Sequence, residues 1–167
     1  MSQTLKYIQA LQRLKQGDLG LLRTHSSKGL DESVDAFDLF AGLWWPLRQK
    51  SQFAPRREVA WLVSKLYAAC PLAHIAGNLF AQQLARCQPH EEKARRRFLQ
   101  HFDLVLRTPL RKLEPDMQWG LNRIRERKGS LDWVKLTDDL SYWERQSTRR
   151  QWAEQFVHFN TGETDAN

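Results

Sequence analysis

The segment from Leu131 to Phe156, LDWVKLTDDLSYWERQSTRRQWAEQF, most constrains the fold because helical periodicity occurs in it twice. In its first half, apolar residues recur at spacings of three and four. This spacing predicts that one side of a helix carries Trp133, Leu136, Leu140 and Trp143. The second half repeats this spacing with Trp152, Phe156 and Phe159. We therefore predict a helical hairpin that builds one C-terminal core and carries at its turn Arg145, Arg149 and Arg150.

Helical patterns also fill the rest of the chain, and proline or glycine separates them. Helices are predicted at residues 2–16, 33–44, 55–70, 73–87, 91–106 and 115–128. Between them we expect a turn at 17–24, a loop at 24–33 and a short turn or helix at 109–113. The helix at 55–70 has the clearest apolar stripe and is expected to be central. With no convincing strand, the predicted fold class is all-α, a compact helical bundle of about seven to eight helices.

The 167 residues suffice to bury a core without disulfides or metal, which favours a single domain over residues 1–160 and a polar tail over 161–167. The only two cysteines, Cys70 and Cys87, agree with a reducing compartment. The sequence has no apolar run near the roughly 20 residues that span a bilayer, and its N-terminal stretch lacks a signal-peptide pattern. We therefore expect a cytoplasmic protein that does not enter a membrane.

Basic residues outnumber acidic residues 26 to 19, which gives a formal net charge of +7. This excess favours a polyanionic partner, with nucleic acid first and an acidic membrane surface second. The basic residues gather in runs, namely Arg95 to Arg97, Arg111 and Lys112, Arg123 to Lys128, and Arg145 to Arg150. Three consecutive helical residues spread over about 200°, so part of the first run must pack or form salt bridges instead. The alternative for all of them is an ordinary solvated surface.

The aromatic residues mostly occupy predicted core positions, so the sequence does not indicate base stacking. Trp44 and Trp45 are the exception, because adjacent helical residues do not easily face one core. One of the two is available to contact a partner.

A zinc site can be drawn from C-x3-H and C-x2-H pairs, which comprise Cys70 with His74 and Cys87 with His90. Pro71 interrupts the first pair, and both cysteines also suit apolar helix faces, so a buried role is favoured. The sequence contains none of the common hydrolase, P-loop or metalloprotease motifs, and its histidines have no recurrent carboxylate partner. Asp138 and Asp139 point about 100° apart on a helix and are expected to keep an exposed face soluble and to pair with Lys135 or nearby arginines. We predict neither a cofactor nor a catalytic residue.

The order of several short motifs resembles the CasB family. These are GDLGLLR ending at Arg23, LDES from Leu30, EVAWLVSKLYA from Glu58, RRRF from Arg95, and a C-terminal pattern comprising Leu131, Asp132, Trp133, Asp139, Leu140, Trp143, Trp152, Ala153 and Phe156. The family is the small subunit of the type I-E CRISPR surveillance complex, Cascade. The resemblance covers nearly the full length.

The resemblance implies an all-helical, non-catalytic subunit present in two copies in Cascade, where it contacts other Cascade subunits and guide RNA and helps to hold target DNA and the displaced strand. It implies that basic surface residues do this, at positions corresponding to Arg23, Arg56, Arg96, Arg123 and Arg145. The predicted nucleic-acid-binding set also includes Arg97 and Arg127, from the same basic runs. The cysteine and histidine pairs do not belong to the family pattern. The alternative functions are a small helical metal-dependent enzyme and a protein-only adaptor with a basic interaction face.

Overall fold

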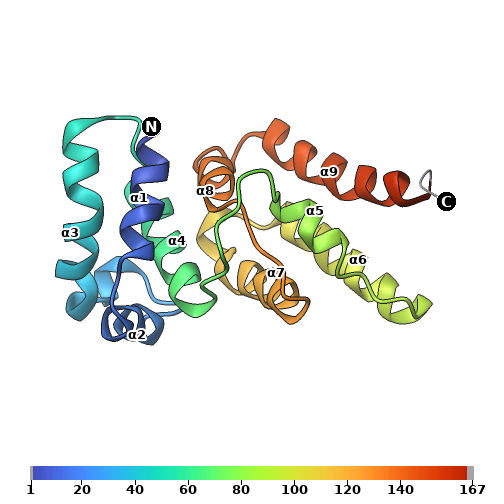
Figure 1. The fold of residues 1–167 in the computed structure, drawn as a ribbon, viewed down its shortest axis with the longest axis horizontal. Coiled ribbons are helices and arrows are strands. Elements are labelled where there is room, and N and C mark those ends of the chain that lie inside the picture. The colour runs from blue at the N-terminus through green and yellow to red at the C-terminus, as the bar shows by residue number, and fades with distance from the viewer. Residues whose placement is uncertain (1, 165–167) are drawn as a thin grey trace. The chain divides into compact units, whose positions relative to one another are not determined.

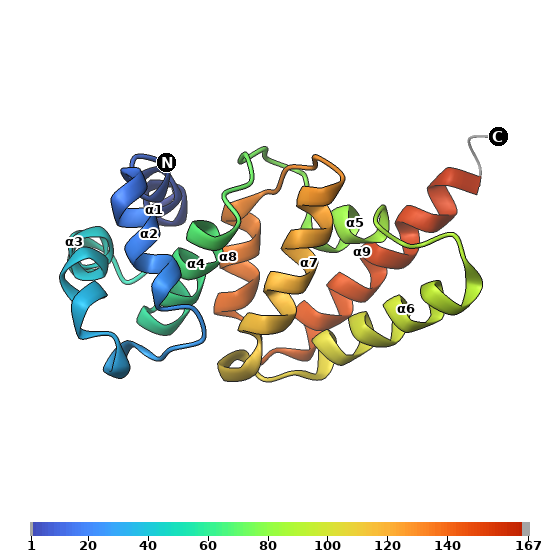
Figure 2. The same cartoon turned by 90° about the horizontal axis from the view of Figure 1, so that it is seen from below.

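The structure is a computed structural model that describes the backbone of residues 2–164 and the side chains of residues 2–158. This part of the chain contains α-helices and two short 3-10 helices but no strand (Figures 1 and 2). The elements in chain order are α1 (Gln3–Gln12), α2 (Gln16–Thr24), η1 (Leu30–Glu32), α3 (Val34–Lys50), α4 (Arg57–Ala69), α5 (Phe80–Ala85), α6 (Glu92–Arg107), η2 (Leu110–Lys112), α7 (Glu114–Glu126), α8 (Trp133–Ser141) and α9 (Gln146–Thr164). The predicted all-α fold class is confirmed.

The chain forms two compact units. Unit 1 comprises Met1–Pro71 and Trp133–Ser141, and unit 2 comprises Leu72–Asp132 and Tyr142–Asn167. Helix α8 therefore completes unit 1, although the segments on both sides of it in sequence belong to unit 2. Neither unit is a continuous stretch of chain. The single domain expected over residues 1–160 stays a prediction.

Unit 1 is built around α4, as the sequence predicted. Every residue from Val59 to Ala68 is buried, and α4 packs against α2, α3 and α8. Helix α1 packs against α3 and α8, and the Tyr7 hydroxyl of α1 donates a 2.6 Å hydrogen bond to the Ala60 carbonyl. Burial raises the pKa of Tyr7 well above its ordinary value, so this hydroxyl keeps its proton and its hydrogen bond.

Two predicted boundaries in unit 1 are wrong. Residues 17–24 were expected to form a turn, but they belong to α2, because Leu19 and Leu22 are one helical turn apart and both are buried. This extra helix accounts for nine α-helices in the described residues instead of seven to eight. Pro46 was expected to end a helix, but α3 continues through it to Lys50. A proline inside a helix leaves the carbonyl four residues earlier without its hydrogen bond. Here that carbonyl belongs to Gly42, which is exposed, so water can replace the lost donor.

Unit 2 is held together by α5, which packs against α7 and α9, while α6 also packs against α9. Phe80 of α5 contacts Trp152 of α9, with ring centroids 5.0 Å apart. Phe102 of α6 stacks on Phe156 of α9 at 4.3 Å. The predicted helix at 91–106 is confirmed as α6, where the Glu91 carboxylate accepts hydrogen bonds from two backbone amides of the first turn.

The helix predicted at 73–87 is shorter than expected and begins only at Phe80. The preceding residues instead run extended beside residues 130–132. The Ile75 amide donates to the Leu131 carbonyl, and the Leu131 amide donates to the Ala73 carbonyl, both at 3.0 Å. Gly77 adopts a φ of 91°, which glycine tolerates and a helix does not use. Long-range pairing therefore overrides the local helical pattern here.

The predicted C-terminal core is divided. Trp133, Leu136 and Leu140 are buried in unit 1, where α8 packs on α1 and α4, whereas Trp143, Trp152 and Phe156 are buried in unit 2. Asp138 and Asp139 do not lie on an exposed face as predicted: Asp139 is buried and pairs with Lys135 at 2.6 Å, and Asp138 accepts from Thr4. Helix α9 includes residues 161–164 of the predicted tail, while residues 165–167 and the Phe159 side chain lie outside the described part.

Replacing Gly120 of α7 with alanine should destabilise the protein by up to about 2 kcal/mol. A Cβ atom there would lie 2.5 Å from Cζ of Phe80, whose ring also contacts Trp152 and has little room to retreat. The overpacking costs about 1–3 kcal/mol, which exceeds the roughly 1 kcal/mol that alanine gains over glycine in a helix. Urea unfolding monitored by circular dichroism measures the change.

Gly42→Ala is the matched control for this substitution, because Gly42 also lies inside a helix and a Cβ atom there meets nothing within 4 Å. It should raise stability by up to about 1 kcal/mol. A stabilising effect at both glycines would contradict close packing of α5 on α7.

Candidate nucleic-acid interface

The predicted arginines occur in both units. Arg23 and Arg56 belong to unit 1, and the other five belong to unit 2, namely Arg96, Arg97, Arg123, Arg127 and Arg145. All are exposed except Arg56, which is half-buried just before α4. Within unit 2, α6 carries one pair, and the C-terminal end of α7 carries another. The structure thus brings together the arginines that share a helix.

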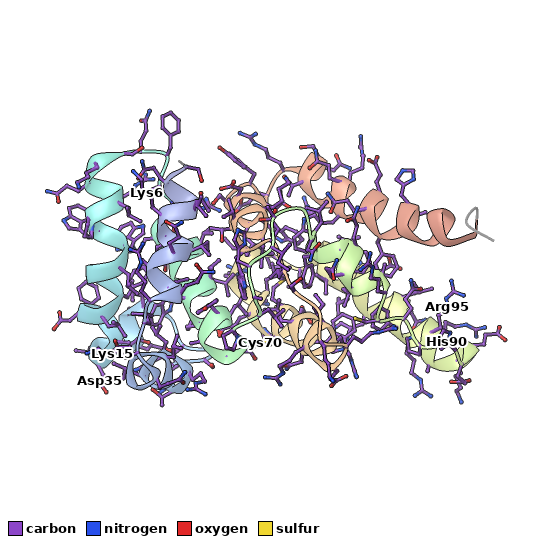
Figure 3. The ribbon with its side chains drawn as sticks, viewed as in Figure 1. Lys6, Lys15, Asp35, Cys70, His90 and Arg95 are labelled. Carbon is purple, nitrogen blue, oxygen red and sulfur yellow. The ribbon has the colours of Figure 1, made fainter. Side chains whose placement is uncertain are left out.

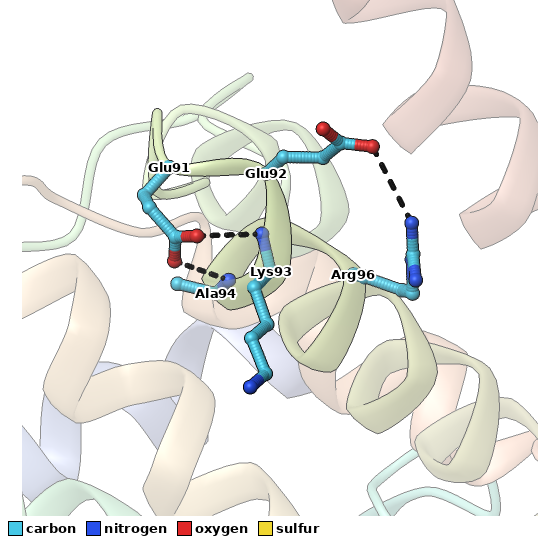
Figure 4. Close-up of polar contacts among 5 residues, drawn as sticks. All are labelled: Glu91, Glu92, Lys93, Ala94 and Arg96. Atoms are coloured by element: carbon cyan, nitrogen blue, oxygen red, sulfur yellow. Dashed lines mark hydrogen bonds and ion pairs between the residues drawn. The ribbon is translucent and has the colours of Figure 1, made fainter.

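On α6, Arg96 lies opposite the buried face. Phe98, Phe102 and Val105 point inward, and at 100° per residue Arg96 is about 160° away from Phe98. The Arg96 guanidinium lies 3.4 Å from the Glu92 carboxylate, one turn earlier (Figure 4). Arg95 and Arg97 flank it, and Figure 3 labels Arg95 near the beginning of the helix. An exposed ion pair of this kind contributes only about 0.3–0.5 kcal/mol, so a phosphate can displace it.

On α7, Arg123 points away from buried Met117, Leu121 and Ile124, and Arg127, the C-cap residue, follows it one turn later, nearer to the buried face. Arg123 pairs with Glu126 at 3.3 Å. The Arg127 guanidinium donates to the backbone carbonyl of Arg86, just after α5. Arg127 therefore also has a structural role, which the sequence analysis missed because the two residues are 41 positions apart.

Arg145 lies in the turn before α9, where it is held by its neighbours. Its guanidinium stacks over the Tyr142 ring at 4.2 Å from the centroid, and its amide donates to the Tyr142 carbonyl. The Arg149 guanidinium donates a long hydrogen bond of 3.4 Å to the Glu144 carbonyl, and Arg150 is exposed. Arg145 is thus positioned while its charge stays accessible.

In unit 1, exposed Arg23 lies at the end of α2 and precedes a loop that α4 holds in place. The Lys28 carbonyl of this loop accepts hydrogen bonds from Trp61 Nε1 at 3.0 Å and from Lys65 Nζ at 2.8 Å. Lys65 is buried, and its ammonium lies 5.1 Å from the Trp61 ring centroid. The sequence analysis missed both residues; the signal was a lysine one turn after a tryptophan within an otherwise apolar helix.

The zinc alternative finds no support in the geometry. Among the described side chains, no three histidine, cysteine or acidic residues lie close enough together to hold a metal ion, and this includes Cys70, His74, Cys87 and His90. The Cys87 thiol donates to the Gln83 carbonyl, and burial raises its pKa. This favours a protonated packing role over a thiolate ligand.

One histidine has a carboxylate partner that no sequence motif indicated, namely His101. Its Nε2 atom lies 3.1 Å from Asp116 Oδ1, and its ring stacks on Trp119 at 3.7 Å between centroids. The pair joins α6 to α7, so sequence spacing could not reveal it.

No helix in the described residues combines the length and the apolar character that a bilayer span requires.

Comparison with known proteins decides the family. The sequence profile described as CRISPR-associated protein Cse2 matches residues 18–156, most of the chain. The chain belongs to the Cse2 family. This confirms the resemblance found from the sequence motifs, since CasB is the name given to several solved structures of the same fold.

Solved structures of Cse2 and CasB proteins share the fold along nearly their whole length. A Cse2-family CRISPR-associated protein from Thermus thermophilus is 20% identical with a TM-score of 0.73, covering 95% of this chain and 99% of that one. CasB from M. ruber is 17% identical with a TM-score of 0.75, covering 99% and 98%. CasB from Thermobifida fusca is 16% identical with a TM-score of 0.71, covering 92% and 97%. Among curated protein sequences, none matches this chain.

Proposed function

We propose that this Cse2-family protein is a non-catalytic, nucleic-acid-binding subunit of a type I-E CRISPR Cascade ribonucleoprotein. The observation that carries the proposal is the exposure of six predicted arginines in a chain that belongs to the Cse2 family. In this proposal the protein acts in the cytoplasm, its partners are the other Cascade subunits with guide RNA and a second copy of itself, and its ligands are target DNA and the displaced strand.

The proposed mechanism is electrostatic. Pairing of guide RNA with target DNA replaces a DNA duplex by an RNA–DNA duplex of similar stability. Contacts to phosphates can therefore shift this equilibrium toward the R-loop without reading the base sequence. Arg23, Arg96 and Arg145 present charges that local contacts orient but do not bury. Each phosphate that an arginine neutralises releases counterions and favours the R-loop.

The salt dependence of binding tests this mechanism. If all seven predicted arginines contact phosphates, each copy of this chain should add up to about −6 to the slope of log K against log salt for duplex DNA, and about −5 for a single strand. The measurement is target-DNA affinity of the reconstituted complex, with and without this chain, from about 50 to 200 mM salt. Equal slopes with and without the chain would exclude phosphate contacts as its contribution.

A further inference from the structure

Helix α3 has two apolar stripes about 100° apart around its axis, and one of them packs on the rest of unit 1. On the inner side, Ala36 and Phe40 are buried. Trp44 belongs to the same side: its ring stacks on Phe40 at 5.7 Å, and its indole N–H donates to the Pro55 carbonyl at 2.7 Å. A surface helix needs one apolar stripe to pack on its own domain. The second stripe is largely exposed, and its Trp45 ring lies 5.8 Å from the Trp44 ring between centroids.

The outer stripe follows the helical repeat at spacings of three, four and four, through Val34, Phe37, Ala41 and Trp45. These residues fall within about 80° around the helix at 100° per residue. Val34 is 80% exposed, Phe37 48% and Trp45 51%. Of the adjacent tryptophans singled out in the sequence, Trp44 thus faces the core, and Trp45 faces solvent.

Phe53, just beyond the end of α3, adds an aromatic side chain that is 78% exposed. The Arg48 guanidinium donates to the Gln52 and Ala54 carbonyls, both at 2.9 Å, and so fixes the backbone on both sides of Phe53. The Phe53 amide donates to the Ser51 hydroxyl. A preformed turn loses little entropy on binding, and exposed aromatics are the side chains that most often anchor protein interfaces.

The charges beside the stripe indicate which class of partner fits. Four exposed carboxylates lie at the beginning of α3 and just before it, on Asp31, Glu32, Asp35 and Asp38. None of them forms an ion pair with the part of the chain that the structure describes. Figure 3 labels Asp35 at this end of the helix. In a chain of net charge +7, such a cluster repels nucleic acid and attracts a basic protein surface.

We propose that the α3 face, defined as Val34, Phe37, Trp45 and Phe53 together with these four carboxylates, is a docking surface for a different protein subunit. The partner surface has an apolar pocket for the aromatic residues and lysine or arginine side chains where it meets the carboxylates. The inference rests on the proposed function, because the partner is sought among the other Cascade proteins. It assigns this face to protein contact and leaves DNA to the arginines.

The test uses the complex of the other Cascade proteins with guide RNA, assembled without this chain and without DNA. The double substitution Phe37→Ser and Trp45→Ser should weaken incorporation of this chain at least about tenfold, because central aromatic anchors dominate interface energy. Trp45→Phe should retain most of the affinity. Leu104→Ser, which removes an equally exposed apolar side chain from α6, should leave incorporation unchanged.

A charge variant tests the second half of the proposal. Asp35→Lys with Asp38→Lys should also weaken incorporation, and the remaining binding should depend less on salt than that of the wild type. All substituted side chains are exposed, so the melting temperature should stay within a few degrees of the wild-type value. Thermal unfolding of each variant separates lost docking from lost folding.

The outcomes distinguish this proposal from the one on which it rests. Incorporation of the Phe37→Ser, Trp45→Ser variant with wild-type affinity overturns the α3 docking surface and leaves the Cascade role standing. Failure of the wild-type chain to join the complex overturns both. A wild-type dimer in sedimentation that the double substitution abolishes, with incorporation unaffected, would assign this face to a second copy instead.

Discussion

Reversing the charge at Arg23, Arg96 and Arg145 together should weaken target-DNA binding by the reconstituted complex on the order of a hundredfold or more near 0.1 M salt. In each copy of the chain, loss of three phosphate contacts reduces the magnitude of the slope of log K against log salt by about 2.7 for duplex DNA. Between 50 and 200 mM salt, the variant should therefore lose about 40-fold less affinity than the wild type for each copy that contacts the DNA. Filter binding or fluorescence anisotropy across this range measures both quantities.

A matched variant separates the effect of direct arginine–phosphate contacts from the effect of the protein's net charge. Lys6, Arg13 and Lys15 are also exposed and lie outside the predicted set, and Figure 3 labels Lys6 and Lys15 in unit 1. Each reversal lowers the charge by two, so either triple variant reduces the net charge from +7 to +1. Equal weakening by both triples would mean that net charge, rather than the three predicted arginines, governs binding.

Folding should be little affected by the arginine substitutions, because the three side chains are exposed. Arg96 loses an ion pair with Glu92 and Arg145 loses its contact with the Tyr142 ring, and each contact contributes about 1 kcal/mol or less. The melting temperature of the complex-free protein checks this. A large drop would make the DNA-binding loss uninformative, and single reversals would then be compared instead.

Sequence reasoning succeeded where local signals decide the structure. Helix α4 follows from a broad apolar stripe, and α6 follows from a stripe that begins after an acidic cap and ends before a proline. It failed where distant residues compete with the local pattern. Residues 73–79 read as helix, but their amides and carbonyls pair with residues 130–132, which no window around residue 75 contains.

The same distinction applies to the candidate site. The exposure of Arg96 and of Arg123 follows from helical periodicity alone. The Arg127 contact to Arg86 and the two bonds from α4 to the Lys28 carbonyl join residues more than 30 positions apart. Sequence can therefore identify which charges reach solvent, whereas the contacts that orient them require the fold.

Replacing either Trp133 or Trp143 with alanine should lower the melting temperature by about 6–20 °C. Both indoles are buried: Trp133 packs edge-on against Tyr67 at 5.3 Å in unit 1, and Trp143 packs against Trp152 at 4.8 Å in unit 2. Removing a buried tryptophan costs about 3–5 kcal/mol, and a protein of this size loses about 2–4 °C per kcal/mol. Tyr142→Ala, next to Trp143 but exposed, should change stability far less.

The two tryptophan variants also test the single domain predicted for residues 1–160. Helix α8 is part of unit 1, yet the residues that precede and follow it belong to unit 2, so unit 1 cannot be completed until the chain has passed through most of unit 2. We therefore expect one cooperative unfolding transition, which Trp133→Ala and Trp143→Ala shift alike. Calorimetry that resolves two transitions, each moved by only one substitution, would instead show two domains that unfold independently.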